Sequence, residues 1–122
     1  MRLPSYVNGS WIEGDGDGVA VRHAITGAPI TTVSSAGIDF SAVLRYGRQT
    51  GGPALRRMSN HERAYLLKAV AKYLLERKEK FYEISAMTGA TRGDSWVDIE
   101  GGIGTVLSLS GIARRELPDE SF

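Results

Sequence analysis

The sequence predicts two short antiparallel β-hairpins followed by about four α-helices. Three observations support this order. An Asn8-Gly9 dipeptide lies between β-forming residues, a second pair of β-rich runs surrounds Gly27, and apolar residues repeat at helical spacing from Phe40 onward. We therefore expect a β-hairpin region at residues 1–36 and a helical region at residues 37–122.

The first hairpin is centred on Asn8-Gly9, because this dipeptide favours the tight turn that joins two paired strands. A glycine-rich acidic run, Glu13-Gly-Asp-Gly-Asp-Gly18, follows it and superficially suggests a calcium site. An EF-hand loop needs oxygen ligands as far as a glutamate at its last position, about twelve residues along. Here the acidic run passes directly into Val19-Ala-Val21, so we favour a solvated loop between the hairpins.

The second hairpin is predicted to pair residues 19–22 with residues 30–33. Gly27 and Pro29 lie between these runs, and both residue types are common in turns. The helical region then begins with Asp39 as the predicted cap of a first helix, which we expect to end at Gly51-Gly52-Pro53.

The second predicted helix begins at a capping box, in which Ser59 caps the helix and Glu62 reaches back to it. Its apolar stripe comprises Leu66, Leu67, Val70, Ala71 and Leu74. We interpret this stripe as core, with a groove for a partner helix as the alternative. The charged run Glu76–Lys80 is expected to break the helix, and a further helix should stop at Gly89.

The last predicted helix starts at Asp94 or Ser95 and contains Gly101, Gly102 and Gly104. A glycine inside a helix costs roughly 1 kcal/mol relative to alanine, so we expect a neighbouring element to pack closely against this segment. A dinucleotide-binding glycine motif must follow a strand and open a helix. Because this run follows residues at helical spacing, we favour close helix packing over phosphate binding.

No group of side chains suited to catalysis or metal binding is found in the sequence. His23 and His61 are the only histidines, and each is interpreted as structural. Asp98 and Glu100 are two residues apart and cannot share one face of a helix, which argues against an acid–base pair. We therefore assign no catalytic, cofactor-binding or metal-binding residue within positions 1–122.

Composition excludes several classes of function. The chain has no cysteine, so it offers no disulfide, thiolate ligand or cysteine nucleophile. The net charge is +1 and the basic residues do not gather on one face, which argues against nucleic-acid binding. No secretion signal and no long apolar run are present, so we predict no membrane partner and a cytoplasmic location.

In layout the chain resembles the beginning of the aldehyde dehydrogenase superfamily. The matching features are Tyr6-Val-Asn-Gly9 with Trp11-Ile12, the Ala24–Gly27 turn, the start Ser59-Asn-His-Glu-Arg63, the leucine series from Leu66 to Leu74 with Arg77, and Thr88-Gly89. Arg22-His23 replaces the Asn-Pro usual in the family. The run Ala90–Thr105 with Arg114–Pro118 is similar to the branch that acts in aerobic phenylacetate breakdown, in which a hydratase-like domain is joined to the dehydrogenase.

The resemblance implies an α/β parent with a Rossmann-type cofactor domain, of which residues 1–122 would be the incomplete amino-terminal part. It also implies oxidation of a CoA-thioester semialdehyde with NADP or NAD. In the family a cysteine thiolate attacks the aldehyde and a glutamate activates water, and both lie beyond residue 122 in the family's order. We therefore expect this segment to be structural, inactive and without bound cofactor.

The resemblance further implies that the partners of this segment are the remainder of the same polypeptide and other copies in a homo-oligomer. Two alternatives stay open. The chain could be a stand-alone interaction module that docks a partner through Leu66–Leu74 or through the Trp96–Val106 face. It could instead belong to a relative that reduces acyl-CoA, which would keep the cysteine but not the deacylating glutamate.

Overall fold

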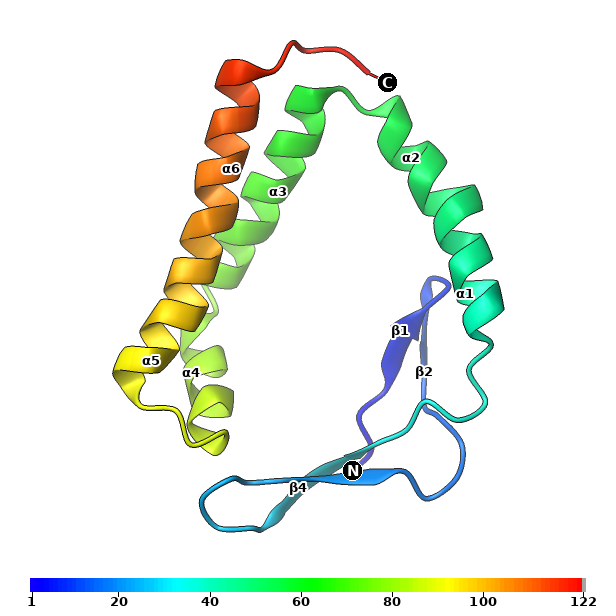
Figure 1. The fold of residues 1–122 in the computed structure, drawn as a ribbon, viewed down its shortest axis with the longest axis vertical. Coiled ribbons are helices and arrows are strands. Elements are labelled where there is room, and N and C mark those ends of the chain that lie inside the picture. The colour runs from blue at the N-terminus through cyan, green and yellow to red at the C-terminus, as the bar shows by residue number, and fades with distance from the viewer. Residues whose placement is uncertain (122) are drawn as a thin grey trace. The chain divides into compact units, whose positions relative to one another are not determined.

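A computed structural model describes residues 1–121. The chain forms two compact units, one at Met1–Pro53 and the other from Ala54 onward. Figure 1 shows the fold. The first elements along the chain are four short strands, namely β1 (Ser5–Val7), β2 (Ser10–Ile12), β3 (Val19–Arg22) and β4 (Pro29–Val33). They form two separate two-stranded antiparallel sheets, β1–β2 and β3–β4. Both predicted hairpins are therefore present.

The first hairpin turns at Asn8 and Gly9, whose φ angles are 52° and 83°. Positive φ at both central residues is the requirement of the tight turn that Asn-Gly favours, so this prediction is confirmed. Tyr6 and Trp11 lie opposite each other in the register. Their rings are 5.1 Å apart in an edge-to-face arrangement, a cross-strand contact that stabilises the short ladder.

The second hairpin pairs β3 with β4 and turns at Gly27, whose φ is 71°. The Arg22 side chain donates to the carbonyl oxygen of Gly27 at 3.0 Å and supports this turn. The backbone N–H of Leu3 donates to the carbonyl oxygen of Thr32 at 2.9 Å. The amino terminus therefore adds to the edge of β4 beside the second hairpin.

Asp39 caps α1 (Phe40–Tyr46) by accepting from the backbone N–H of Ala42 at 3.0 Å, as predicted. The prediction that this helix ends at Gly51-Gly52-Pro53 is wrong. A π-helical turn, η1 (Gly47–Gly51), follows α1, and the helix continues as α2 (Gly52–Arg57). Proline disrupts the hydrogen bonding of a regular helix. Here an irregular, wider turn ends at Gly51, two positions before Pro53.

The unit from Ala54 onward is helical. After α2 it contains α3 (Asn60–Leu75), α4 (Lys78–Met87), α5 (Arg92–Trp96), η2 (Val97–Gly101) and α6 (Gly102–Glu116), of which η2 is a π-helical turn. The predicted breaks near Glu76 and Gly89 are confirmed. Helices α3 and α6 lie side by side and run antiparallel in Figure 1.

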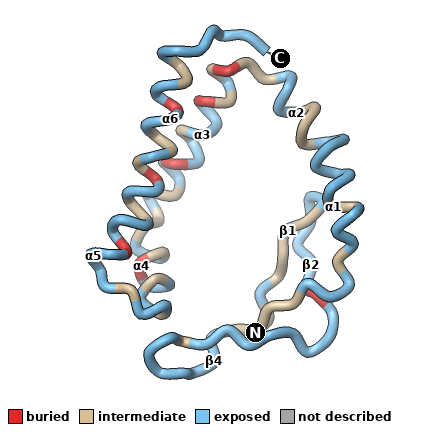
Figure 2. The backbone as a smooth tube through the Cα atoms, in the orientation of Figure 1, coloured by how far each residue is buried: buried red, intermediate tan, exposed pale blue. Residues whose placement is uncertain are grey.

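Three small residues and one isoleucine are buried where α3 packs against α6. Ala64 and Ala71 of α3 and Ile103 and Ser110 of α6 are buried. Figure 2 shows buried positions in red along both helices. The Ser110 hydroxyl donates to the carbonyl oxygen of Ala64 at 2.7 Å. Small side chains let the two helices approach, and this hydrogen bond satisfies the one buried hydroxyl between them.

The interpretation of Leu66–Leu74 as core is wrong for most of its members. Leu66, Leu67 and Val70 are 47%, 47% and 46% exposed, and only Ala71 of the stripe is buried. The reason is the direction from which α6 packs. It covers the face that carries Ala64 and Ala71, and no described residue buries Leu66 or Leu67.

The expected close neighbour of the glycine-bearing helix is also missing from the described chain. A Cβ atom built at Gly101, Gly102 or Gly104 would meet no described heavy atom within 4 Å outside the adjacent residues and the nearby backbone of its own helix. These glycines instead lie where the π-helical turn η2 joins α6. The two small sheets and the helices agree with the predicted order of elements, while the Rossmann-type organisation of a parent domain stays a prediction.

Candidate functional site

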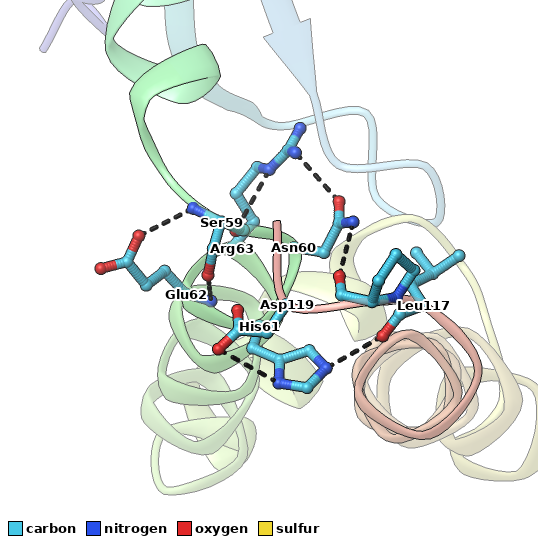
Figure 3. Close-up of polar contacts among 8 residues, drawn as sticks. Ser59, Asn60, His61, Glu62, Arg63, Leu117 and Asp119 are labelled. Atoms are coloured by element: carbon cyan, nitrogen blue, oxygen red, sulfur yellow. Dashed lines mark hydrogen bonds and ion pairs between the residues drawn. The ribbon is translucent and has the colours of Figure 1, made fainter. Parts of the chain in front are cut away.

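The amino-terminal end of α3 carries the first of two polar clusters in the helical unit. Ser59 accepts from the backbone N–H of Glu62 at 3.2 Å, and Glu62 accepts from the backbone N–H of Ser59 at 2.7 Å. Figure 3 shows this reciprocal pair. The capping box predicted from the sequence is therefore confirmed, and it fixes the start of α3.

Asn60 connects this helix start to residues 117–120, which we call the C-terminal strap. Its backbone N–H donates to the carbonyl oxygen of Glu120 at 3.0 Å, and its side-chain amide donates to that of Pro118 at 2.9 Å. Arg63 donates to the amide oxygen of Asn60 at 3.0 Å. Asn60 is buried, so these bonds satisfy a polar group that would otherwise destabilise the fold.

His61 makes the remaining contacts with the strap (Figure 3). Its Nε2 lies 3.1 Å from the carbonyl oxygen of Leu117, and its Nδ1 lies 3.6 Å from a carboxylate oxygen of Asp119. A hydrogen bond from Ser59 lowers the pKa of Asp119, burial opposes this effect, and the interaction with His61 lowers the pKa further. These contacts are all within the chain, which agrees with the structural role predicted for His61.

The second polar cluster surrounds Glu100 in η2. Lys78 of α4 donates to one carboxylate oxygen of Glu100 at 3.0 Å, and the Tyr82 hydroxyl donates to the other at 2.8 Å. The hydrogen bonds from Lys78 and Tyr82 lower the pKa of Glu100. Burial, followed by the hydrogen bond to Glu100, raises the pKa of Tyr82.

Arg92 completes the Glu100 cluster. Its guanidinium lies 4.2 Å from the centre of the Tyr82 ring and 3.4 Å from a carboxylate oxygen of Glu79. The cluster therefore joins α4 to both α5 and η2. A carboxylate held ionised by two donors is poorly suited to accept and return a proton near neutral pH, so we interpret Glu100 as a structural acceptor.

Sequence reasoning considered Glu100 only together with Asp98 and missed its partners on α4. Lys78 and Tyr82 are four residues apart, which places them on one face of a helix. That spacing was a usable signal for a polar face. Nothing in the sequence alone indicated that this face would meet Glu100, because the contact depends on how α4 turns back against η2.

The acidic loop 13–18 is organised by an arginine. Arg2 donates to the carbonyl oxygens of Gly14 and Gly16, and the Ser34 hydroxyl donates to the carbonyl oxygen of Asp15 at 2.6 Å. Within residues 1–121, no three acidic or histidine side chains form a group that could hold a metal ion. A positively charged side chain inside the loop agrees with the interpretation of this loop as a hairpin connection.

The remaining sequence candidates are not brought together. His23 accepts from the backbone N–H of Ile25 at 3.2 Å and supports the second hairpin turn. The run Gly101–Gly104 lies inside a helix rather than between a strand and a helix. The run therefore lacks the strand, glycine loop and helix of the dinucleotide-binding fingerprint, in which the loop opens a helix directly after a strand.

The comparisons with known proteins point to one class of enzyme. No protein-family profile matches the chain. Two curated relatives share similarity over 90% of it, and both are semialdehyde dehydrogenases. The resemblance to the aldehyde dehydrogenase superfamily is thereby confirmed.

One relative is the 3,4-dehydroadipyl-CoA semialdehyde dehydrogenase of Aromatoleum evansii, which is 42% identical over 111 residues. Another is the N-succinylglutamate 5-semialdehyde dehydrogenase of Chromobacterium violaceum, which is 29% identical over 115 residues. The chain spans 22% and 23% of the length of these relatives.

Among the described residues, no helix has both the length and the apolar character that crossing a bilayer requires.

Proposed function

We propose that the chain forms the amino-terminal part of an NAD(P)-dependent aldehyde dehydrogenase that oxidises a CoA-thioester semialdehyde. The observation that carries the proposal is the 42% identity to a dehydrogenase named for such a substrate, over 90% of this chain. The relative named for a substrate without CoA is less similar, at 29% identity. Aerobic phenylacetate breakdown in the cytoplasm is the setting that we propose for this activity.

Within that enzyme the segment has a structural role. The described polar clusters join helices to one another, and their donors and acceptors are used within the chain. The absence of cysteine from the sequence means that residues 1–122 do not supply the thiolate that the family uses. The nucleophile, the deacylating glutamate and the cofactor loop belong, in this proposal, to the remainder of the polypeptide.

The test is an assay of the longer polypeptide that contains this chain. We expect reduction of NADP or NAD with a CoA-thioester semialdehyde, and a much lower kcat/KM with the matching semialdehyde that lacks CoA. Equal kcat/KM values would contradict the CoA-thioester assignment. Formation of aldehyde from acyl-CoA without measurable oxidation would favour the acyl-CoA-reducing alternative. The 122-residue chain, assayed beside it, should show no turnover.

One observation favours a second candidate function, a stand-alone interaction module. The exposed leucines on α3 and the exposed Trp96, at 57%, offer apolar surface to a partner. This alternative expects the 122-residue chain to be monodisperse and to unfold cooperatively. The dehydrogenase proposal expects dye binding and self-association of the isolated segment, and size-exclusion chromatography separates the two.

A further inference from the structure

An apolar pocket of about 260 Å³ lies in the helical unit, lined by Leu74, Phe81, Ile99 and Ile103. These residues come from four different elements, α3, α4, η2 and α6. Ile103 is buried, whereas the other three are half-buried. The pocket is therefore an indentation whose walls are fixed by helix packing and whose mouth is open to solvent.

The pocket is better suited to side chains than to a small molecule. Binding sites for ligands commonly have volumes of about 300–1,000 Å³ and place a few polar groups to orient the ligand. This pocket is smaller, and all four lining residues are apolar. Because the wall offers no donors or acceptors, binding to it is favourable only when it removes apolar surface from water.

Exposed apolar residues lead along α3 into the pocket. Leu67 and Val70 precede Leu74 by seven and four residues, spacings that place all three on one face of the helix. Leu67 and Val70 are nearly half exposed, although α6 is packed against a different face. Leu74 belongs both to this face and to the pocket lining, and we call the pocket together with Leu67 and Val70 the α3 groove.

We propose that the α3 groove receives one or two large apolar side chains from the remainder of the same polypeptide. This inference rests on the proposed function. The two relatives are more than four times as long as the matched segment, so most of such a polypeptide lies outside this chain. A covalently attached segment meets the groove at a high effective concentration, whereas a second copy must first lose translational and rotational freedom.

The test uses thiol labelling of the longer polypeptide, read at the individual peptide by mass spectrometry. The variant Ile99→Cys places a thiol at the pocket wall, and no other cysteine lies within residues 1–122. We expect labelling to be at least about tenfold slower in the longer polypeptide than in the 122-residue chain, because a covered thiol reacts only after local opening. The variant Leu74→Cys provides a second position if Ile99→Cys does not fold.

The matched control is Glu83→Cys on the exposed side of α4, which should react at the same rate in both proteins. Equal labelling of position 99 in a folded longer polypeptide would overturn the proposal. Protection of position 99 in the longer polypeptide that is lost on dilution would also overturn it, in favour of a second copy. Dehydrogenase activity is measured separately, so protection without activity, or activity without protection, tells which proposal has failed.

Discussion

The two glycine-rich segments of this chain, at 13–18 and 101–104, look alike in composition but need glycine for different reasons. At Gly14 a Cβ atom would lie 2.2 Å from the backbone oxygen of Ser34, a separation that no side chain can occupy. At Gly101, Gly102 and Gly104 the same atom would meet nothing within 4 Å beyond the adjacent residues and the nearby backbone of its own helix, among the described residues. A high glycine content therefore indicates close packing only where the structure supplies the neighbour.

The two segments are also stabilised by different contacts. The first segment folds against residues 34–37, where the Asp15 backbone N–H donates to the carbonyl oxygen of Ala36 at 2.9 Å. The second segment follows a π-helical turn that the Glu100 cluster fastens to α4. The loop therefore packs closely at its glycines, whereas the helix is stabilised by contacts of Glu100, the residue that precedes its glycines.

The largest effect is expected for Gly14→Ala. The added methyl group would overlap the backbone at Ser34, and overpacking of this kind typically costs about 1–3 kcal/mol of unfolding free energy. Gly16→Ala is the matched control, because Gly16 has a φ of 70° but open space around it. Gly16→Ala should lower the unfolding free energy by only roughly 1 kcal/mol, because alanine is strained at a positive φ. Thermal or urea unfolding of both variants measures the difference, and equal losses would mean that the overlap is relieved cheaply.

A smaller change of opposite sign is expected for Gly102→Ala in the 122-residue chain. Gly102 has helical dihedral angles and no close neighbour, so alanine should raise the stability of this helix by up to about 1 kcal/mol. Helix content by circular dichroism and the melting temperature report the gain. In the longer polypeptide we expect Gly102→Leu to lower the melting temperature before any catalytic step changes, because the sequence predicts a close neighbour at this helix. Lost cofactor affinity at unchanged stability would instead indicate a ligand role.

The smallest effect is expected from Glu100→Gln, and it depends on pH. Because the folded-state pKa of Glu100 is below its ordinary value of 4.5, its contribution is fully present above about pH 4.5. It is lost as the pH falls through the folded-state pKa. Wild type should therefore unfold at a higher temperature than the variant near neutral pH, and the gap should close in acid.

The control for Glu100→Gln is Asp98→Asn, which removes one negative charge from an exposed position in the same turn. Its melting temperature should stay close to that of the wild type across the same pH range. A gap between Glu100→Gln and wild type that persists unchanged in acid would show that the ionised carboxylate is not what fastens η2 to α4.

Sequence reasoning succeeded where the signal is local. The turn at Asn8-Gly9, the Asp39 cap and the Ser59–Glu62 capping box each depend on residues within three positions of one another, and each is confirmed. Such patterns act through the backbone of a single turn. Their physical basis is contained in the residues themselves.

Features that depend on distant residues could not be predicted. Asn60 bonds to Pro118, 58 positions away, and no property of either residue alone indicates the pairing. The exposure of Leu66 and Leu67 depends on which face of α3 packs against α6, and the apolar stripe alone does not determine that face. For the same reason, the Glu100 cluster could not be predicted from the sequence. Its acceptor, Glu100, lies on η2, and its donors, Lys78 and Tyr82, lie on α4.

The π-helical turns have a consequence for how sequences of this kind can vary in length. Both η1 and η2 end directly before a second glycine, at Gly51-Gly52 and Gly101-Gly102. A π-helical turn absorbs one additional residue while the helix on either side keeps its orientation. A one-residue deletion within Val97–Gly101 could therefore close as ordinary α-helix and leave Ser110 facing Ala64. Alignments of homologous chains should place single-residue gaps here before placing them anywhere else in the last helix.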